Sequence, residues 1–124
     1  MKHLRTYAIL EKFDNNLMDI VTKIREHDYE YIENILKNKL IDVNSTVGSA
    51  INVPLIGVVQ DIGMLELLTK YGADWYKKEA NGDDFIDRLE NSTDKYGILK
   101  YIKWKHPEKY QEHRTRKDAE KYNL

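Results

Sequence analysis

The chain has 124 residues, enough for one domain with its own core, and its lack of cysteine excludes disulfide bonds and cysteine-ligated zinc. One third of the residues are charged, yet the net charge is −1, because residues 1–94 carry −6 and residues 95–124 carry +5. No apolar run approaches the roughly 20 residues that cross a membrane, and the first residues lack the apolar stretch of a signal peptide. We therefore expect a cytoplasmic protein with no membrane partner.

Helical periodicity predicts three short helices in the N-terminal part of the chain. Apolar residues recur at helical spacing, which is typical of a half-buried helix, within residues 4–9, 17–24 and 29–36. Asp28 directly precedes the third of these segments and is predicted to cap it. Residues 45–52 are small and polar, so we expect a loop there.

The rest of the chain is also expected to be helical. Pro54 suits the first turn of a helix, because its missing N–H is not needed there. A helix around residues 64–68 should end at Gly72, which accepts a left-handed backbone. The apolar face of the last helix should include residues 98–102. No run of β-branched residues alternates with polar residues, so little sheet is predicted.

Two stretches of the sequence recur at a nearly constant offset. Leu-Ile-Asp-Val-Asn at 40–44 aligns with Gly-Ala-Asp-Trp-Tyr at 72–76, which is 32 positions later. Pro54-Leu55 aligns with Phe85-Ile86 after 31 positions. Each unit would hold a helix, a tight turn, a second helix and a polar loop. Such a recurrence indicates a repeat architecture in which stacked units share one core.

The segment from Lys70 to Ile86 resembles the ankyrin-repeat family. Lys-Tyr-Gly-Ala-Asp at 70–74 and Asn-Gly-Asp-Asp-Phe-Ile at 81–86 follow the family's pattern: a helix ending in Gly-Ala-Asp, a β-turn finger, Asn-Gly, and the start of the next helix. The chain departs from that pattern where Asp-Phe-Ile at 84–86 replaces Thr-Pro-Leu.

The resemblance implies a single all-α domain, an ankyrin-like helix–turn–helix solenoid of about three degenerate repeats with helical caps. The expected boundaries are 15–44, 53–80 and 81–105 for the repeats, and 1–14 and 106–124 for the caps, within one domain at 1–124. Gly72 and Gly82 would supply unusual backbone angles at the two ends of the finger. Asp74 would bond to nearby backbone amides.

None of the sequence motifs that carry catalysis or cofactor binding is present, so we expect a protein that is not an enzyme and has no cofactor. His106 and His113 are seven residues apart, with Glu112 nearby, and could share one helix face as metal ligands. The competing interpretation, which we favour, is a solvated tail that binds no metal.

The finger and the helix after it form the predicted partner-binding surface, because fingers and first helices line the concave face of ankyrin-type stacks. The predicted residues are Trp75, Tyr76, Lys77, Lys78, Glu79, Asp83, Asp84, Asp87 and Glu90. The acidic members could dock a basic partner, or they could cap a helix, where carboxylates face the positive end of the helix dipole. Trp75 could anchor a partner or pack into the interface between repeats.

The basic C-terminal segment interleaves aromatic residues with lysines. Tyr96, Tyr101, Trp104 and Tyr110 could stack nucleic-acid bases. The competing interpretation is that Ile98, Leu99, Tyr101, Ile102 and Trp104 form the buried face of the last helix, with the lysines in water. The second interpretation is favoured, because the acidic body of the chain disfavours a nucleic-acid partner.

The favoured function is a protein-binding module that blocks its partner. A free-standing ankyrin-like chain of this size resembles the small immunity proteins of bacterial toxin–immunity systems, such as those of contact-dependent inhibition. That resemblance implies a toxin partner, often a nuclease with a basic active cleft, toward which an acidic inhibitor would be steered. The alternatives are a generic ankyrin scaffold, adaptor or effector, and a nucleic-acid-binding protein that uses the basic C-terminal tail.

Overall fold

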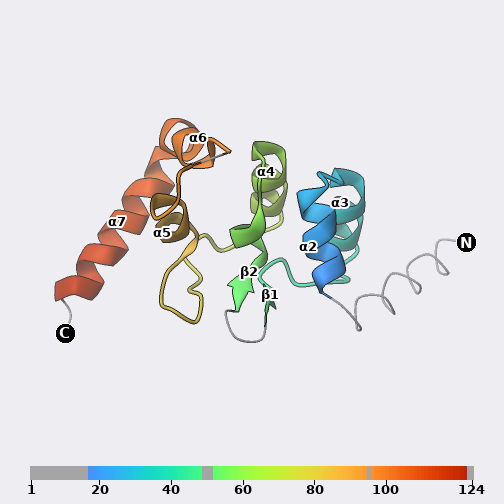
Figure 1. Cartoon of the computed structure of the whole chain (residues 1–124), viewed down its shortest axis with the longest axis horizontal. Coiled ribbons are helices and arrows are strands. Elements are labelled where there is room, and N and C mark those ends of the chain that lie inside the picture. The colour runs from blue at the N-terminus through green and yellow to red at the C-terminus, as the bar shows by residue number, and fades with distance from the viewer. Residues whose placement is uncertain (1–16, 49–51, 95, 123–124) are drawn as a thin grey trace, which may run out of the picture.

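The computed structural model describes residues 17–48, 52–94 and 96–122. Helices dominate this part of the chain, and they follow one another along the longest axis of the molecule, from α2 and α3 to α7 (Figure 1). The expected all-α class is confirmed, and the one departure in the described residues is a pair of two-residue strands. The predicted helix at 4–9 and the N-terminal cap at 1–14 lie outside the described residues.

The first helix pair consists of α2 (Met18–Arg25) and α3 (Tyr29–Lys37). Each helix buries one apolar stripe, with Ile20 and Ile24 on α2 and Ile32 on α3 among its members. The Asp28 carboxylate accepts the N–H of Tyr31 at 3.1 Å and begins α3, as predicted.

The second pair is introduced by a short hairpin. Strand β1 (Thr46–Val47) pairs antiparallel with β2 (Val53–Pro54), so the predicted loop at 45–52 is wrong at Thr46–Val47. Pro54 has an extended backbone and stands just before the 3-10 helix η1 (Leu55–Val58), not inside the first turn of a helix. Helix α4 (Ile62–Lys70) follows.

The turn after α4 has the backbone that the glycines predict. Gly72 follows the last turn of α4 with φ at 91°, and Gly82 has φ at 88°. Both angles lie in the left-handed region, where a residue without a Cβ is favoured.

The third pair consists of α5 (Phe85–Glu90) and α6 (Ile98–Lys105), and α7 (Pro107–Tyr122) follows it. Ile98 and Ile102 are buried, as expected for the apolar face of α6, but Trp104 on the same helix is 75% exposed. Helix α7 has a single buried residue, His113. An apolar stripe therefore does not hold α7 in place.

Helix caps recur along the chain at nearly the spacing that the sequence indicates. Asp28, Asp61 and Asp94 are 33 residues apart, and each precedes the second helix of a pair. Each carboxylate accepts backbone N–H groups from the start of that helix. An aspartate therefore serves the start of the second helix in each pair, as the N-cap residue in the first two pairs and from three residues before the N-cap Gly97 in the third.

The turns between pairs also recur, and they are bonded to each other. Asp42 and Asp74, 32 residues apart, each accept the N–H of the residue two positions later, at 2.9 Å, which confirms the predicted role of Asp74. Asn44 Oδ1 accepts the N–H of Asp74 at 2.7 Å, and the Asn44 side-chain amide donates to the carbonyl of Gly72 at 3.3 Å. These bonds fix the second turn on the first.

Buried apolar residues from α2 to α6 form one continuous core. Trp75 belongs to it, at 1% exposure, with its ring edge-on to Phe85 at 5.7 Å and to His106 at 5.3 Å. Its indole N–H donates to Thr69 Oγ1 at 3.0 Å, so its one polar atom is satisfied. Among the described helices, none combines the length and apolar character needed to cross a membrane.

Candidate binding cleft

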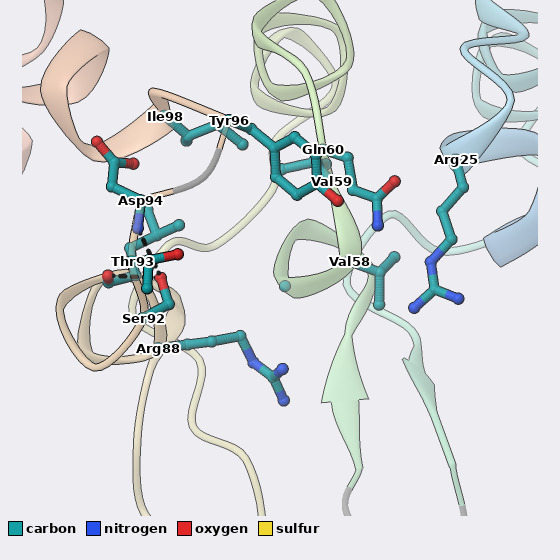
Figure 2. Close-up of a pocket in the computed structure, with 12 residues that line it drawn as sticks. Arg25, Val58, Val59, Gln60, Arg88, Ser92, Thr93, Asp94, Tyr96 and Ile98 are labelled. Carbon is teal, nitrogen blue, oxygen red and sulfur yellow. Dashed lines mark hydrogen bonds between the residues drawn. The ribbon is translucent and has the colours of Figure 1, made fainter.

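A cleft of about 340 Å³ opens where the first helix of each pair connects to the second (Figure 2). Arg25 is the last residue of α2, residues 57–60 end η1 and lead to α4, and residues 92–94 and 96 lie between α5 and α6. Its lining consists of Arg25, Gly57, Val58, Val59, Gln60, Arg88, Leu89, Ser92, Thr93, Asp94, Tyr96 and Ile98. The cleft therefore draws on all three helix pairs.

Gly57 forms part of the cleft floor, and Val53 packs tightly against it on the side away from the cleft. A Cβ at Gly57 would lie 2.7 Å from Val53 Cγ1, so the position does not accommodate a side chain without movement. The same Cβ would lie 3.9 Å from Arg88 Nε and from Glu79 Oε1. The bare backbone of η1 thus lies beside a charged pair.

Two arginines face the cleft, and the acidic groups near them already have partners within the protein. Arg88 Nε lies 2.5 Å from Oε1 of Glu79, whose side chain is buried behind the cleft. Within the described residues, Arg25 has no ion-pair or hydrogen-bond partner. The Asp94 carboxylate accepts the N–H groups of Leu99 at 2.8 Å and Lys100 at 3.2 Å. Among the described lining residues, the guanidinium groups of Arg25 and Arg88 are therefore the positively charged groups that face a ligand.

None of the nine residues predicted to bind a partner lines this cleft. Trp75, Glu79 and Asp84 are buried, with exposures of 1%, 7% and 4%, so the expectation that they form a surface is wrong. Of the two interpretations of Trp75, the structure supports packing into the interior, because its ring lies between Phe85 and His106.

The capping interpretation of the acidic group is correct for Asp84 and Asp87. Asp84 Oδ1 accepts the N–H of Asp87 at 2.9 Å, and Asp87 Oδ2 accepts the N–H of Asp84 at 3.0 Å. This reciprocal capping box satisfies two backbone donors at the start of α5. Asp83 does not cap α5; its backbone carbonyl accepts the N–H of Glu79, and its own N–H donates to Asn81.

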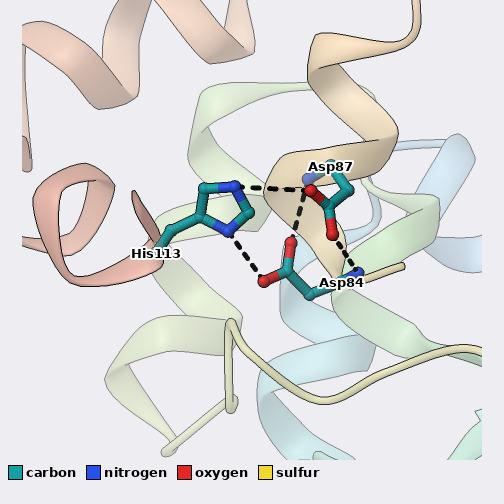
Figure 3. Close-up of side chains that lie close together, drawn as sticks. All are labelled: Asp84, Asp87 and His113. Atoms are coloured by element: carbon teal, nitrogen blue, oxygen red, sulfur yellow. Dashed lines mark hydrogen bonds and ion pairs between the residues drawn. The ribbon is translucent and has the colours of Figure 1, made fainter. Parts of the chain in front are cut away.

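The capping box is also the docking site of α7. His113 projects from α7 between Asp84 and Asp87 (Figure 3), with Nδ1 2.8 Å from Asp84 Oδ2 and Nε2 3.4 Å from Asp87 Oδ1. Glu90 Oε1 lies 3.3 Å from the same Nε2. His113 is 2% exposed, so the expectation of a solvated tail is wrong at this residue.

Lys117 strengthens the same junction. Its Nζ lies 2.7 Å from Asp87 Oδ2. Burial raises the pKa of Asp87, but Lys117, the amide of Asp84 and His113 together outweigh burial and hold that pKa below its usual value. The pKa of Lys117 is raised, chiefly by its hydrogen bond to Asp87. Both groups thus favour their charged forms.

The ligand atoms of Asp84, Asp87 and His113 lie within 4.8 Å of one another, close enough to consider a metal ion. Each carboxylate oxygen already faces a backbone N–H, an imidazole nitrogen or Lys117. Helix capping and the docking of α7 therefore explain the cluster. His106, the other histidine considered for a metal, lies 2.6 Å from Glu66 and does not share a partner with His113.

The remaining predicted residues contact α7 or the neighbouring turn. Tyr76 donates its hydroxyl to the carbonyl of Lys109 at 3.3 Å, and Arg116 lies over its ring at 4.4 Å. Lys78 is exposed and pairs with Glu120 of α7. Lys77 Nζ donates to the carbonyl of Asn44 at 2.5 Å. This side of the finger is an internal interface, and it is mainly polar.

Sequence reasoning missed a second polar cluster, around Asp61. Its carboxylate accepts from the Tyr29 hydroxyl and from the N–H of Met64, and His27 Nδ1 lies 2.8 Å from it. Burial raises the pKa of Asp61, but the bonds from Tyr29, His27 and Met64 prevail and lower it. The 33-residue spacing from Asp28 is the signal in the sequence that could have identified Asp61 as a cap.

Comparisons of the chain with protein-family models, with curated proteins and with solved structures returned no match.

Proposed function

We propose that the protein is a non-enzymatic binding module in which degenerate ankyrin-like helix pairs hold another protein. The cleft is the observation that carries this proposal, because it is formed jointly by three helix pairs. Concave sites that combine an apolar floor with a few polar groups are where proteins bind their ligands. Caps and turns that recur after 32 or 33 residues support the repeat architecture.

A binding role also agrees with the roles of the two polar clusters, because both clusters make their contacts within the protein. The Asp84–Asp87–His113 cluster joins α7 to α5, and the Asp61 cluster begins α4. The cleft itself combines apolar residues with guanidinium groups, which recognise carboxylates and phosphates through paired hydrogen bonds. A cleft with this lining is suited to binding a ligand that carries both apolar and negatively charged groups.

In its more specific form, the proposal is that the partner is a basic toxin domain, such as a nuclease, and that the protein is the immunity protein that blocks its active cleft. This form rests on analogy alone, through the ankyrin-like pattern of residues 70–86. The charge of −6 on residues 1–94 would steer a basic partner over long range. A generic adaptor is the alternative, and an adjacent toxin gene would distinguish the two.

The test is capture of the partner on the immobilised protein at physiological salt, followed by an activity assay of that partner. Thr93 is exposed at the mouth of the cleft, so Thr93→Trp should obstruct the cleft and weaken binding by about tenfold or more. Thr115→Trp, on an exposed position of α7, is the matched control and should not weaken it. A partner that binds without any change in its activity would remove the inhibitor role. Equal binding by both variants would place the interface elsewhere.

One observation favours a second candidate function, the binding of single-stranded nucleic acid. Trp104 is 75% exposed on α6, between Lys103 and Lys105, and stacking of one base on such a ring is worth about 1–3 kcal/mol. Two other aromatic residues of the segment are engaged, since Tyr101 donates to Glu66 and Tyr110 donates to Glu90. Salt-dependent retention of oligo-dT that Trp104→Ala abolishes would support this function, and no retention would exclude it.

A further inference from the structure

We propose that the part of the partner that enters the cleft is an acidic peptide segment, with a carboxylate side chain beside an apolar one. This inference rests on the proposed binding function and adds the chemistry of the partner at the site. Two guanidinium groups carry it, because Arg25 and Arg88 line the same cleft from different helix pairs and both side chains extend toward it (Figure 2).

Arg88 is held in position by Glu79. Its Nε lies 2.5 Å from Glu79 Oε1, and the Glu79 side chain is only 4% exposed, whereas that of Arg88 is 41% exposed. The described contact engages Nε, which leaves the two terminal nitrogens of the guanidinium for a ligand. A planar group fixed in this way is prepared for a two-bond contact with a carboxylate.

Arg25 supplies the second cation without a partner of its own among the described residues. The nearby acidic residues of α2 and the turn after it, Glu26 and Asp28, contact Lys23 instead. Arg25 sits at the C-terminal end of α2, where the helix dipole favours a positive charge. An exposed arginine that contributes no internal ion pair is available for a ligand.

Two acidic groups lie near the cleft, and both already have partners within the protein. Glu79 lies buried behind Arg88, and Asp94 directs its two oxygens to the first turn of α6, where they accept two backbone N–H groups. A ligand therefore meets N–H donors at the rim, and an acidic side chain is the protein group that these donors match.

The rest of the lining indicates a peptide rather than a nucleic acid. Val58 and Leu89 provide apolar surface beside the arginines, which suits an aliphatic or aromatic side chain. Gln60 and Thr93 have no hydrogen-bond partner among the described side chains and can bond a peptide backbone. The two cations among the described lining residues come from different helix pairs, and they do not form the continuous positive track that follows a phosphate backbone.

The test is a selection of random peptides displayed on phage against the immobilised full chain, repeated against Arg25→Gln/Arg88→Gln. Peptides enriched on the wild-type chain should be rich in Asp and Glu. A synthetic copy of one such peptide should shift the amide resonances of Val58 and Val59. Its affinity should fall by about tenfold in Arg25→Gln, the loss of one charge-assisted contact. Arg114→Gln, the same substitution at an exposed position of α7, should bind as the wild type does.

Arg88→Lys covers the case in which Arg88→Gln fails to fold because Glu79 is left buried and unpaired. It keeps a positive charge near Glu79 but loses the planar pair of donors, so the chain should stay folded and bind the acidic peptide more weakly. The thermal midpoint of each variant is recorded first, so that a change in affinity is not confused with unfolding.

Several outcomes would overturn the inference. They are an absence of enriched sequences, enrichment of neutral or basic peptides, unchanged affinity in Arg25→Gln, and displacement of the peptide by oligo-dT at equal affinity. A partner protein that binds wild type and the double variant equally would overturn this inference and leave the binding function standing. An acidic peptide that binds in the cleft, with no partner inhibited, would keep the inference and remove the inhibitor function.

Discussion

Substitution of His113 by alanine should destabilise the protein more than other single changes in α7. His113 is the one buried residue of this helix, and its imidazole lies among Asp84, Asp87 and Glu90. Alanine would leave Asp84 Oδ2 without its 2.8 Å partner while the side chain remains buried. A carboxylate oxygen in that position loses hydration on folding and gains nothing in return.

The expected loss of unfolding free energy is about 2–4 kcal/mol. Leaving a buried hydrogen-bond acceptor without its partner costs about 1–3 kcal/mol, and more when the group is charged, and the loss should stay within about 2–4 kcal/mol because Asp84 keeps its capping bond to Asp87 and Asp87 keeps Lys117. At roughly 4 °C per kcal/mol for a domain of this size, the thermal midpoint should fall by about 8–16 °C. Urea unfolding followed by circular dichroism measures the free energy, and hydrogen exchange shows whether α7 detaches first.

Arg114→Ala, on an exposed position of the same helix, is the control and should change stability by less than about 0.5 kcal/mol. A double-mutant cycle with Asp84→Asn isolates the contact, because asparagine still caps the helix through its side-chain oxygen. A coupling free energy near zero, or His113→Ala with the stability of the control, would show that α7 is held by other contacts.

Burial, backbone angle and charge each determine the effect expected of a further substitution. Leu68→Ala, at a fully buried position, should cost about 2–5 kcal/mol in urea unfolding, and Leu67→Ala, at a half-buried position, should cost less; equal losses would contradict the packing. Gly72→Ala should cost about 1–2 kcal/mol, because φ is 91° while no atom lies within 4 Å of the added Cβ, so a steric clash should not add to the backbone strain. The pKa of Asp87 is lowered in the folded state, so its contribution to stability is present above its usual pKa near 3.8 and is lost as the pH falls through the folded value. Asp87→Asn should therefore be less stable than wild type at pH 6, and the difference should shrink toward pH 2; a constant difference would refute the linkage.

Local signals in the sequence predicted much of the secondary structure correctly. Asp28 caps α3, Gly72 follows the end of α4 with a positive φ, and Asp74 accepts a nearby backbone N–H. Each of these features depends on residues within a few positions of one another, so the chemistry of one segment determines it. The periodic apolar residues of α2 and α3 were recognisable for the same reason.

The candidate site depended on contacts across the sequence, and there the predictions failed. His113 and Asp84 are 29 residues apart, so nothing local distinguishes this histidine from a solvated one. Trp75 occupies a turn, and its burial depends on Phe85 and His106, which reach it from other elements. In the sequence, Arg25 is a single charged residue at the end of a predicted helix, and nothing local distinguishes it from a solvated arginine. It lines the cleft because three connections between helices lie side by side.

Helix capping explains why the charge of the sequence does not predict the charge that a partner meets at the cleft. Every short helix requires partners for its first N–H groups, and aspartate is one of the best residues to supply them. Asp28, Asp61, Asp84 and Asp94 all serve this purpose, and their oxygens are directed at the backbone.

Arginine has no hydrogen-bond acceptor and cannot cap a helix start in this way, so its charged group stays at the surface. In a stack of short helices, the carboxylate oxygens at each helix start are therefore bonded to the backbone and are not presented to a partner. The cleft lies beside two such helix starts, those of α4 and α6. That is how a segment with a charge of −6 comes to present Arg25 and Arg88 to a ligand.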